Sequence, residues 1–512
     1  MDGQEALEEA THVALTQLNG TMLQGFSWNL PPDGQHWRRL ALLAPRLAEE
    51  GFTSVWMPPA YKGVGGVRDV GYGVYDLWDL GEFDQRESVG TKYGTREEYQ
   101  TAVNTLREVG INVLADIVLN HRLGADGTQR VLATEVAGDN RYYAMDKPRP
   151  ITAWTRFTFP GRGGALDDFS WDYHCFKAVD YDVAHERSGI FLLDGKQWDE
   201  DVDRENGNFD YLMGADVDLY NPKVYEQLVK WGTWYLNETG VDGVRLDAIK
   251  HMSREFYLRW LYDMRCAVGH ELFCVGEYWT GDTGALVHYL GNEKALSLFD
   301  VPLHFKFFHA SRDGAQIDFQ HILSGTLVDV DPVHAVTFVD NHDTQPNQSL
   351  ESTVAPWFKP IAYALILLRE AGYPCVFFAD LYGLPNDRIP AVAELPLLLE
   401  IRRRFAFGEQ RDYFDEPDLV AWARMGDQDH EDSGCVVVLS SRIDEEDKVV
   451  KPINLGCEHA GEKWVCVLGE AQEPIEVEED GTTSFAAGKK SMISVYLREE
   501  AARALNCIPI NI

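Results

Sequence analysis

The sequence predicts an α/β protein built on a (β/α)8 TIM barrel, with a subdomain inserted after strand 3 and a C-terminal antiparallel β-sandwich. Three observations carry this prediction. Eight short apolar, β-prone runs recur along the chain, helix-like segments lie between them, and the helical pattern stops near residue 410. Strands that are apolar on both faces and alternate with helices are typical of a parallel sheet, and eight such units are typical of a closed barrel.

The expected barrel strands are the runs at 21–28, 52–59, 111–121, 241–248, 271–279, 296–303, 334–343 and 373–380. Helices are expected in segments such as TREEYQTAVNTLREVG, NPKVYEQLVKWGTWYLNETG and SREFYLRWLYDMRCAVG. These segments have apolar residues at helical spacing and a glycine close to the end. The regular alternation, more than any single strand, indicates the barrel.

About 100 residues separate His121 from the helix before the fourth strand, which is too long for a simple connection and indicates a subdomain. After residue 410, β-prone runs such as CVVVLSSR and SMISVYL are separated by turn residues, which predicts an antiparallel β domain ending in a tail at 498–512. We therefore expect barrel segments at 1–121 and 226–410, an inserted domain at 122–225 and a C-terminal domain at 411–512.

The chain of 512 residues has 46 basic and 82 acidic side chains, a formal net charge of −36. Such a surface repels phosphate backbones and anionic lipids, which argues against nucleic acid or a membrane as the partner. No run reaches the ~18 apolar residues of a membrane span, and the first twenty residues lack the pattern of an export signal. We expect a soluble, cytoplasmic monomer whose eight scattered cysteines are reduced.

Three carboxylates follow three different expected strands: Asp247, Glu277 and Asp343. Because the carboxyl ends of barrel strands meet at one rim, these side chains should converge. Any one of them alone is better explained by a helix cap or an ion pair. Together they favour a catalytic site.

The surroundings of two of these carboxylates differ. Arg245 lies two residues before Asp247, so both side chains point to the same side of the strand, and the guanidinium should hold Asp247 ionised as a nucleophile. Glu277 lies between the apolar run FCVG and two aromatic residues, which should raise its pKa as a general acid requires. Two carboxyl groups in opposed environments are typical of glycoside hydrolysis.

The segments DIVLNH (116–121), GVRLDAIKH (243–251), GEYW (276–279) and FVDNHD (338–343) closely resemble the four signature regions of the glycoside hydrolase family 13 α-amylases, in the same order. Further stretches, among them NGNFDYLMGADVD and LESTVAPWFKP, resemble the liquefying bacterial-type, cytoplasmic-like subgroup. The resemblance covers roughly residues 20 to 497.

By this resemblance, Asp247 would be the nucleophile, Glu277 the general acid and base, and Asp343 the acid that stabilises the transition state. The resemblance also implies residues that bind the sugar chain: Tyr72, His121, Arg245, Lys250, His251 and His342. The expected substrate is therefore an α-glucan such as starch, glycogen or a maltooligosaccharide.

The resemblance further implies a Ca²⁺ site formed by Asn120, Asp210, Asp216 and the backbone carbonyl of His251, all hard oxygen donors. Asp199 and Asp218 match ligands of an additional metal cluster, although they are explained equally well as solvated acids. The sequence departs from that cluster by placing Lys177 and Tyr220 where the relatives have acidic ligands. Because a lysine ammonium would take the place of a cation, we expect one calcium ion.

The predicted activity is endo-acting, retaining hydrolysis of α-1,4-glucosidic bonds. Other hypotheses remain open. The same residues could form maltooligosaccharides of one length or transfer glycosyl groups. An enolase-type barrel could use the acids to bind Mg²⁺, although Arg245 beside Asp247 would oppose a metal there. A catalytically inactive glucan-binding protein is the fourth hypothesis, and the presence of all three carboxylates gives it no support.

Overall fold

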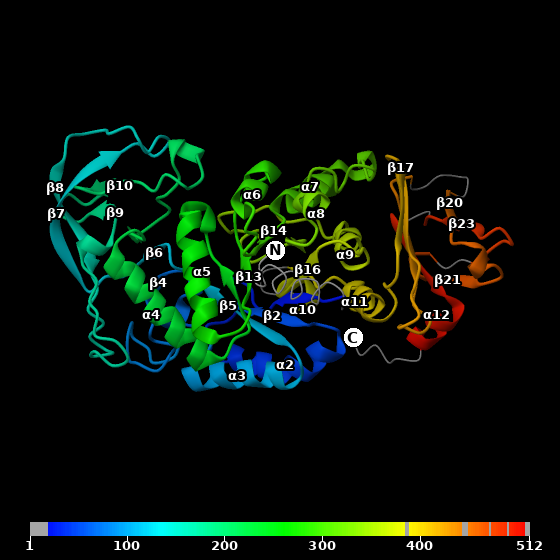
Figure 1. The fold of residues 1–512 in the computed structure, drawn as a ribbon, viewed down its shortest axis with the longest axis horizontal. Coiled ribbons are helices and arrows are strands. Elements are labelled where there is room, and N and C mark those ends of the chain that lie inside the picture. Colours follow the sequence, from blue (N-terminus) through cyan, green and yellow to red (C-terminus); the bar gives the residue numbers. More distant parts are fainter. Residues whose placement is uncertain (1–18, 385–388, 443–448, 471–472, 489–490, 507–512) are drawn as a thin grey trace.

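A computed structural model describes residues 19–384, 389–442, 449–470, 473–488 and 491–506. Its centre is a closed barrel of eight parallel strands in the order β1-β16-β15-β14-β13-β12-β5-β2 (Figure 1). The strands are β1 (Met22–Gln24), β2 (Ser54–Met57), β5 (Asn112–Ile117), β12 (Gly243–Leu246), β13 (Phe273–Gly276), β14 (Ser297–Phe299), β15 (Ala335–Phe338) and β16 (Tyr373–Phe377). Each lies within one of the eight expected runs, so the predicted barrel is confirmed.

Helices surround the barrel: α2 (His36–Glu49), α3 (Arg96–Glu108), α4 (Pro222–Thr239), α5 (Arg254–Val268), α6 (Thr283–Leu290), α7 (Val301–Asp313), α8 (Leu327–Val330), α9 (Lys359–Leu367), α10 (Phe378–Tyr382) and α11 (Leu395–Arg404). Helix α4 shows why these segments are helical. The Asn221 side chain accepts a hydrogen bond from the Lys223 N–H, Pro222 begins the helix, and Gly240 ends it in the left-handed conformation. The buried face of α4 includes Leu228 and Trp231, which face the barrel.

The inserted domain follows β5 and lies at one end of the elongated molecule (Figure 1). Its antiparallel sheet has the order β8-β7-β10-β9. The two-residue strands β6 (His121–Arg122) and β11 (Ala215–Asp216) pair where the domain leaves and re-enters the barrel. The sheet strands are β7 (Gly127–Val136), β8 (Arg149–Arg156), β9 (Ala178–Asp182) and β10 (Arg187–Leu193). Because α4 begins at Pro222, the elements favour ending the inserted domain before that helix instead of at residue 225.

The C-terminal domain has a six-stranded antiparallel sheet, in the order β17-β18-β19-β24-β21-β22, and a two-stranded sheet, β20-β23. One face of the large sheet, with Trp422 and Val437, packs against the barrel. The other face, with Val438 and Tyr496, encloses a second core with Phe485 of the small sheet. The strands are β17 (Gln410–Glu416), β18 (Leu419–Arg424), β19 (Cys435–Ser440), β20 (Val450–Asn454), β21 (Lys463–Leu468), β22 (Ile475–Glu476), β23 (Thr482–Ala486) and β24 (Ile493–Arg498).

The expected tail is partly wrong, because helix α12 (Glu499–Asn506) follows the last strand directly. Ala501, Ala502 and Leu505 of this helix are buried and belong to the main hydrophobic core. Residues 507–512, including Cys507, lie outside the described residues.

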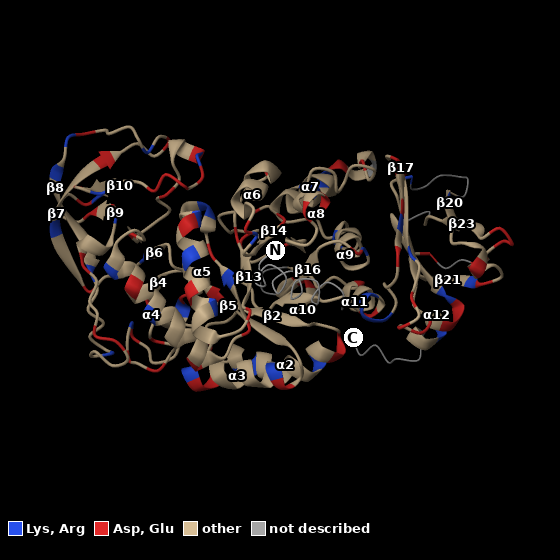
Figure 2. Ribbon diagram, viewed as in Figure 1, with Lys and Arg blue, Asp and Glu red and all other residues tan. Residues whose placement is uncertain are grey.

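Charged side chains of both signs are distributed over all three parts of the molecule (Figure 2). The seven cysteines in the described residues are free thiols. None of the helices in the described part of the chain combines the length and apolarity needed to span a bilayer.

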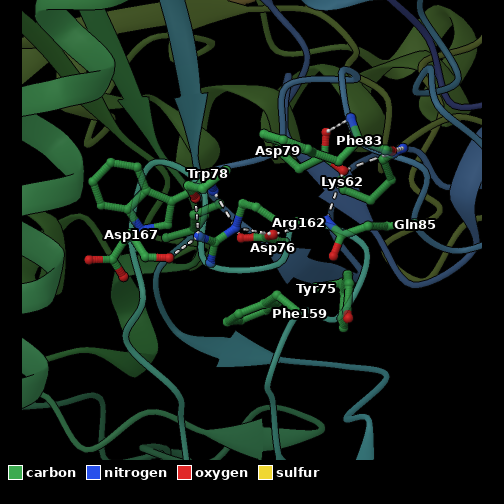
Figure 3. A network of polar contacts seen from close by, with 12 residues as sticks. Lys62, Tyr75, Asp76, Trp78, Asp79, Phe83, Gln85, Phe159, Arg162 and Asp167 are labelled. Atoms are coloured by element: carbon green, nitrogen blue, oxygen red, sulfur yellow. Dashed lines mark hydrogen bonds and ion pairs between the residues drawn. The ribbon is translucent and has the colours of Figure 1, made fainter.

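A buried polar network fastens the inserted domain to the barrel (Figure 3). It includes the hairpin of β3 (Lys62–Gly63) and β4 (Val74–Asp76). Lys62 lies 3.5 Å from Asp79, and the Gln85 amide donates to Asp76 and Asp79 at 2.9 Å each. Arg162, from the inserted domain, donates to Asp76 at 2.9 Å. Because all of these side chains are buried, each carboxylate depends on its partners to offset desolvation.

Arg162 also organises its own loop. It donates to the carbonyl oxygens of Ala165 and Asp167, and the Asp167 carboxylate binds Lys230 of α4 at 2.6 Å. The inserted domain is therefore linked both to the β3–β4 hairpin and to a barrel helix.

Replacing Arg162 by Met should lower the free energy of unfolding by about 3 to 5 kcal/mol, because it leaves the buried Asp76 without its cation. The control is Arg39→Met, which removes the exposed pair with Asp33 and should change stability by about 1 kcal/mol or less. Urea unfolding measures both. Equal effects of the two substitutions would contradict the role of the network.

Candidate active site

The guanidinium of Arg245 lies at the centre of the barrel rim and contacts three carboxylates. Its Nη1 lies 2.9 Å from Asp116 and 2.7 Å from Asp247, and its Nη2 lies 2.8 Å from Glu277. The barrel register places Arg245 of β12 opposite Asp116 of β5 and Val275 of β13. The predicted proximity of Arg245 and Asp247 therefore exists, and Glu277 shares the same cation.

Asp116 is a site residue to which the sequence assigned no role. Its Oδ2 accepts hydrogen bonds from Trp56 Nε1 at 3.0 Å and from the Tyr72 hydroxyl at 2.7 Å. Asp116 therefore connects Arg245 to the loop that carries Tyr72. The sequence could have indicated this role, because Asp116 lies on the strand next to that of Arg245 and a parallel sheet brings residues at neighbouring strand ends together.

Glu277 is held at the start of the loop after β13. Its Oε2 accepts the N–H of Ala248 at 3.2 Å in addition to the bond with Arg245. Ala248 has a positive φ of 51°, a conformation that costs a non-glycine residue about 1 kcal/mol or more. Burial, with smaller effects of Asp247 and Asp343, raises the pKa of Glu277 to about 8, while Arg245 opposes the rise. The expected protonated carboxyl is thus supported.

Asp247 differs from its expected electrostatics. The Arg245 guanidinium favours the ionised form, as expected, but burial has the larger effect and raises the pKa of Asp247 above its ordinary value. Burial likewise raises the pKa of Asp343 to about 7, with Arg245 opposing the rise. Asp116, Asp247, Asp343 and Glu277 thus lie close enough around Arg245 to affect one another's pKa.

A platform of three nearly parallel rings borders the carboxyl cluster. Tyr72 and His342 have ring centroids 5.0 Å apart and planes 16° apart. Trp28 lies 5.8 Å from Tyr72 at 6° and 5.9 Å from His342 at 13°. Rings in this arrangement offer an apolar face to a sugar. Trp28 was not among the predicted site residues.

The protonation of His342 is fixed by a residue from β1. The Gln24 amide nitrogen donates to His342 Nδ1 at 2.9 Å, so Nε2 carries the proton. This Nε2 lies 3.4 Å from Asp343 Oδ2. Burial lowers the pKa of His342 well below its ordinary value, so the ring is a neutral donor.

The other predicted sugar-binding residues lie around the same rim. His121 Nε2 donates to the Tyr72 carbonyl at 2.8 Å and supports that loop. Lys250 binds Glu205 at 2.6 Å and the Trp279 carbonyl at 3.1 Å. The ring of His251 donates to the Phe209 carbonyl at 2.7 Å.

Lys177 lies inside the cluster of predicted metal ligands. Its ammonium contacts both oxygens of Asp210 at 2.6 Å, Asp199 at 2.9 Å and Asp216 at 3.9 Å. All four side chains are buried. The expectation that Lys177 takes the place of a cation is matched by this geometry.

The remaining predicted metal ligands divide into two groups. Asp218 is paired with Lys196 at 2.5 Å, so it also has a lysine partner. Asp216 Oδ2 is buried without a hydrogen bond and has its lysine contact at the longer distance of 3.9 Å. The Asn120 side-chain amide lies 3.4 Å from the His121 ring nitrogen Nδ1. Within the described residues, no group of three or more His, Cys, Asp and Glu side chains is arranged to hold a metal by itself.

Comparisons with known proteins agree with this fold. The family described as "Alpha amylase, catalytic domain" matches residues 45–485. The chain is 46% identical over 490 residues to an alpha-amylase of Bacillus licheniformis, covering 95% of this chain and 94% of that protein. It is 42% identical over 498 residues to the cytoplasmic alpha-amylase of Escherichia coli, covering 94% and 99% of the two chains.

Two further similarities are informative. The chain is 44% identical over 486 residues to a glucan 1,4-alpha-maltohexaosidase of a Bacillus species, covering 94% and 93% of the two chains. The solved alpha-amylase of Geobacillus thermoleovorans, complexed with acarbose, shares the fold with a TM-score of 0.62 at 16% identity, covering 94% of this chain and 99% of that one. Given the family match and these identities over nearly the whole length, the chain belongs to the alpha-amylase family and is a glycosidase of that class.

Proposed function

We propose that this protein is an endo-acting, retaining α-1,4-glucan hydrolase that acts on starch, glycogen and maltooligosaccharides. The observation that carries the proposal is the single Arg245 guanidinium bound to both Asp247 and Glu277. Retaining glycosidases need their two carboxyl groups within ~5 to 5.5 Å of each other, and one guanidinium that contacts both supports a short separation. The names of the relatives support the substrate class.

In the proposed mechanism, Asp247 attacks the anomeric carbon while Glu277 protonates the leaving oxygen, which gives a covalent glycosyl enzyme. Glu277 then deprotonates a water molecule that releases the sugar. The raised pKa of Glu277 supports its role as the acid. Asp343 would stabilise the positive charge that develops on the sugar ring, and Arg245 would hold Asp247 and Glu277 in register.

Sugar binding would use the residues around this centre. Tyr72 would stack on the ring at the cleavage position, and the neutral His342 would donate from Nε2 to a hydroxyl group. His121 supports the Tyr72 loop and would bind the same sugar. Lys250 and His251 would line the positions of the leaving glucose units.

We propose a single Ca²⁺ ion held by Asn120, Asp210, Asp216 and the His251 carbonyl. Asp216 Oδ2 is buried without a hydrogen bond, and its contact with Lys177 is a long one of 3.9 Å, which supports a further cation beside it. The oxygen donors suit calcium. Calcium would supply positive charge between the inserted domain and the barrel. The lysine partners of Asp199 and Asp218 argue against further metal ions.

For the location we propose the cytoplasm, supported by the name of the Escherichia coli relative and by the free thiols of the described cysteines. We further propose a monomer that binds neither nucleic acid nor membranes, supported by the formal charge of −36.

A maltooligosaccharide-forming activity is the second candidate, favoured by the similarity to a maltohexaosidase. It would use the same carboxylates and differ in the length of the product.

The proposed activity predicts that the protein shortens starch at random, with products sized by chromatography over time. Asp247→Asn should lower turnover by a factor on the order of 10⁴ or more, since the nucleophile is lost. The control is Asp242→Asn, at the opposite end of the same strand, where the carboxylate accepts the Val113 N–H. A single early product would favour the second candidate, and full activity of Asp247→Asn would contradict the mechanism.

The rate should depend on pH with two limbs. Glu277 acts as an acid only when protonated, so kcat/KM should fall as the pH rises through about 8. Asp247 acts only when ionised, so the rate should fall on the acid side at a pH above the ordinary Asp value, because burial raises its pKa. Hydrolysis of a chromogenic maltooligosaccharide, with the fold followed by circular dichroism, measures both limbs. A constant rate from pH 7 to about 10 would refute the assignment of Glu277.

The protein should bind one calcium ion per chain. Removing this ion with a chelator should lower the unfolding temperature. The free energy of unfolding should fall by about 2.7 kcal/mol compared with the protein at a free calcium concentration of 100 times the Kd. Lys177→Met should cost about 3 to 5 kcal/mol even with calcium present, because the aspartates lose a buried cation. Lys196→Met, at a more exposed pair, is the control and should cost less. Two or more tightly bound metal ions in the wild-type protein would contradict the cation role of Lys177.

A further inference from the structure

The loop 340–344 follows β15 and carries His342 and Asp343. A buried lysine binds the first residue of this loop. We propose that Lys359, the first residue of α9, is a positioning residue that holds Asp343 in its working orientation. The inference rests on the proposed role of Asp343, and it adds a residue that does not touch the substrate. Lys359 acts through Asp340 and the turn that Asp340 anchors.

Lys359 joins the ends of two neighbouring barrel strands. Its Nζ lies 2.8 Å from Asp340 Oδ2 and also binds Asp380 Oδ1. Asp340 follows β15, and Asp380 follows β16, where its second oxygen accepts the Tyr363 hydroxyl at 2.7 Å. Lys359 is only 4% exposed, Asp340 is 2% exposed and Asp380 is fully buried. Two buried carboxylates therefore share one ammonium group.

The other oxygen of Asp340 anchors the turn. Asp340 Oδ1 accepts the Thr344 hydroxyl at 3.0 Å and the Val354 N–H at 3.2 Å. The Asn341 N–H donates to the same Thr344 oxygen at 3.0 Å. Because β15 ends at Phe338, the turn has left the sheet and depends on these side-chain contacts for its shape.

The turn reaches Asp343 directly. The side-chain oxygen of Asn341 accepts the N–H groups of Asp343 and Thr344, both at 2.9 Å. A continuous series of contacts thus runs from Lys359 through Asp340, Thr344 and Asn341 to the backbone of Asp343. Every member of the series is buried or nearly so.

Removal of the ammonium leaves Asp340 and Asp380 as two buried carboxylates without a cation, a state that is relieved by rotation, protonation or entry of water. Each of these changes alters the anchor of the turn and so the position of the Asp343 carboxylate. A misplacement of about 1 Å in an active site can cost up to about 100-fold in rate. Contacts of the substrate with residues outside this turn should be unaffected.

The test compares Lys359→Met with Lys359→Arg and with Lys451→Met. Lys451 in β20 is 2% exposed and pairs with Asp415 and Glu416 of the C-terminal domain, whose side chains are exposed. Its loss reports the cost of removing a buried ammonium group far from the proposed site. Thr344→Val is a further variant, which interrupts the series at the hydroxyl without removing a charge.

The measurements are kcat and KM on a chromogenic maltooligosaccharide and the inhibition constant of acarbose, together with the unfolding temperature. Lys359→Met should lower kcat about tenfold or more, change KM less than about twofold and weaken acarbose in parallel with kcat/KM. Lys359→Arg should recover most of kcat. Lys451→Met should lose stability and keep kcat. If Lys359→Met does not fold, Thr344→Val should still show a lower kcat with little change in KM, by a smaller factor.

A folded Lys359→Met or Thr344→Val variant with the kcat of the wild type would overturn the proposal, as would an equal loss of kcat in Lys451→Met. Asp343→Asn separates this result from the proposed function. If Asp343→Asn is inactive while Lys359→Met is normal, only the positioning role fails. If Asp343→Asn keeps wild-type activity, the proposed role of Asp343 fails first.

Discussion

The constraint on which the site depends is one buried cation that serves three carboxylates. Arg245 contacts Asp116, Asp247 and Glu277, and it is 1% exposed. Burial raises the pKa values of these acids, since the one positive charge of Arg245 does not fully offset the loss of contact with water. With a pKa of about 8, Glu277 is protonated near neutral pH. Asp116 in turn accepts a hydrogen bond from the Tyr72 hydroxyl, so Arg245 links the charged cluster to the platform of three rings.

The features that could be predicted are those marked by a pattern within one short stretch of sequence. Barrel strands are continuous apolar runs, and their polar ends identified Asp247, Glu277 and Asp343 without reference to distant segments. The contacts that complete the site are not local. Gln24 and His342 form a hydrogen bond although they lie 318 residues apart in the sequence, and Asp247 becomes buried only when the barrel is assembled. Helix α12 was missed because it is short and follows a strand without a turn.

In this acidic protein, several of the basic side chains are buried and bind carboxylates. The sequence has 82 acidic and 46 basic residues, and the excess suits a solvated surface. Inside the molecule a single basic group serves one or more acids: Arg162 binds Asp76, Lys177 lies among three aspartates, and Lys359 lies between two. Buried lysines and arginines therefore join separate segments of this chain.

Lys177 differs from a bound ion in one physical respect, because it is attached to the backbone. A metal ion has a dissociation rate, and its occupancy follows the concentration of the free ion in the surroundings. An ammonium group on a side chain has neither property: it is delivered in fixed stoichiometry when the chain folds, and dilution or competing chelators cannot remove it. The aspartates around Lys177 therefore keep one positive charge among them in any compartment, whatever its supply of calcium.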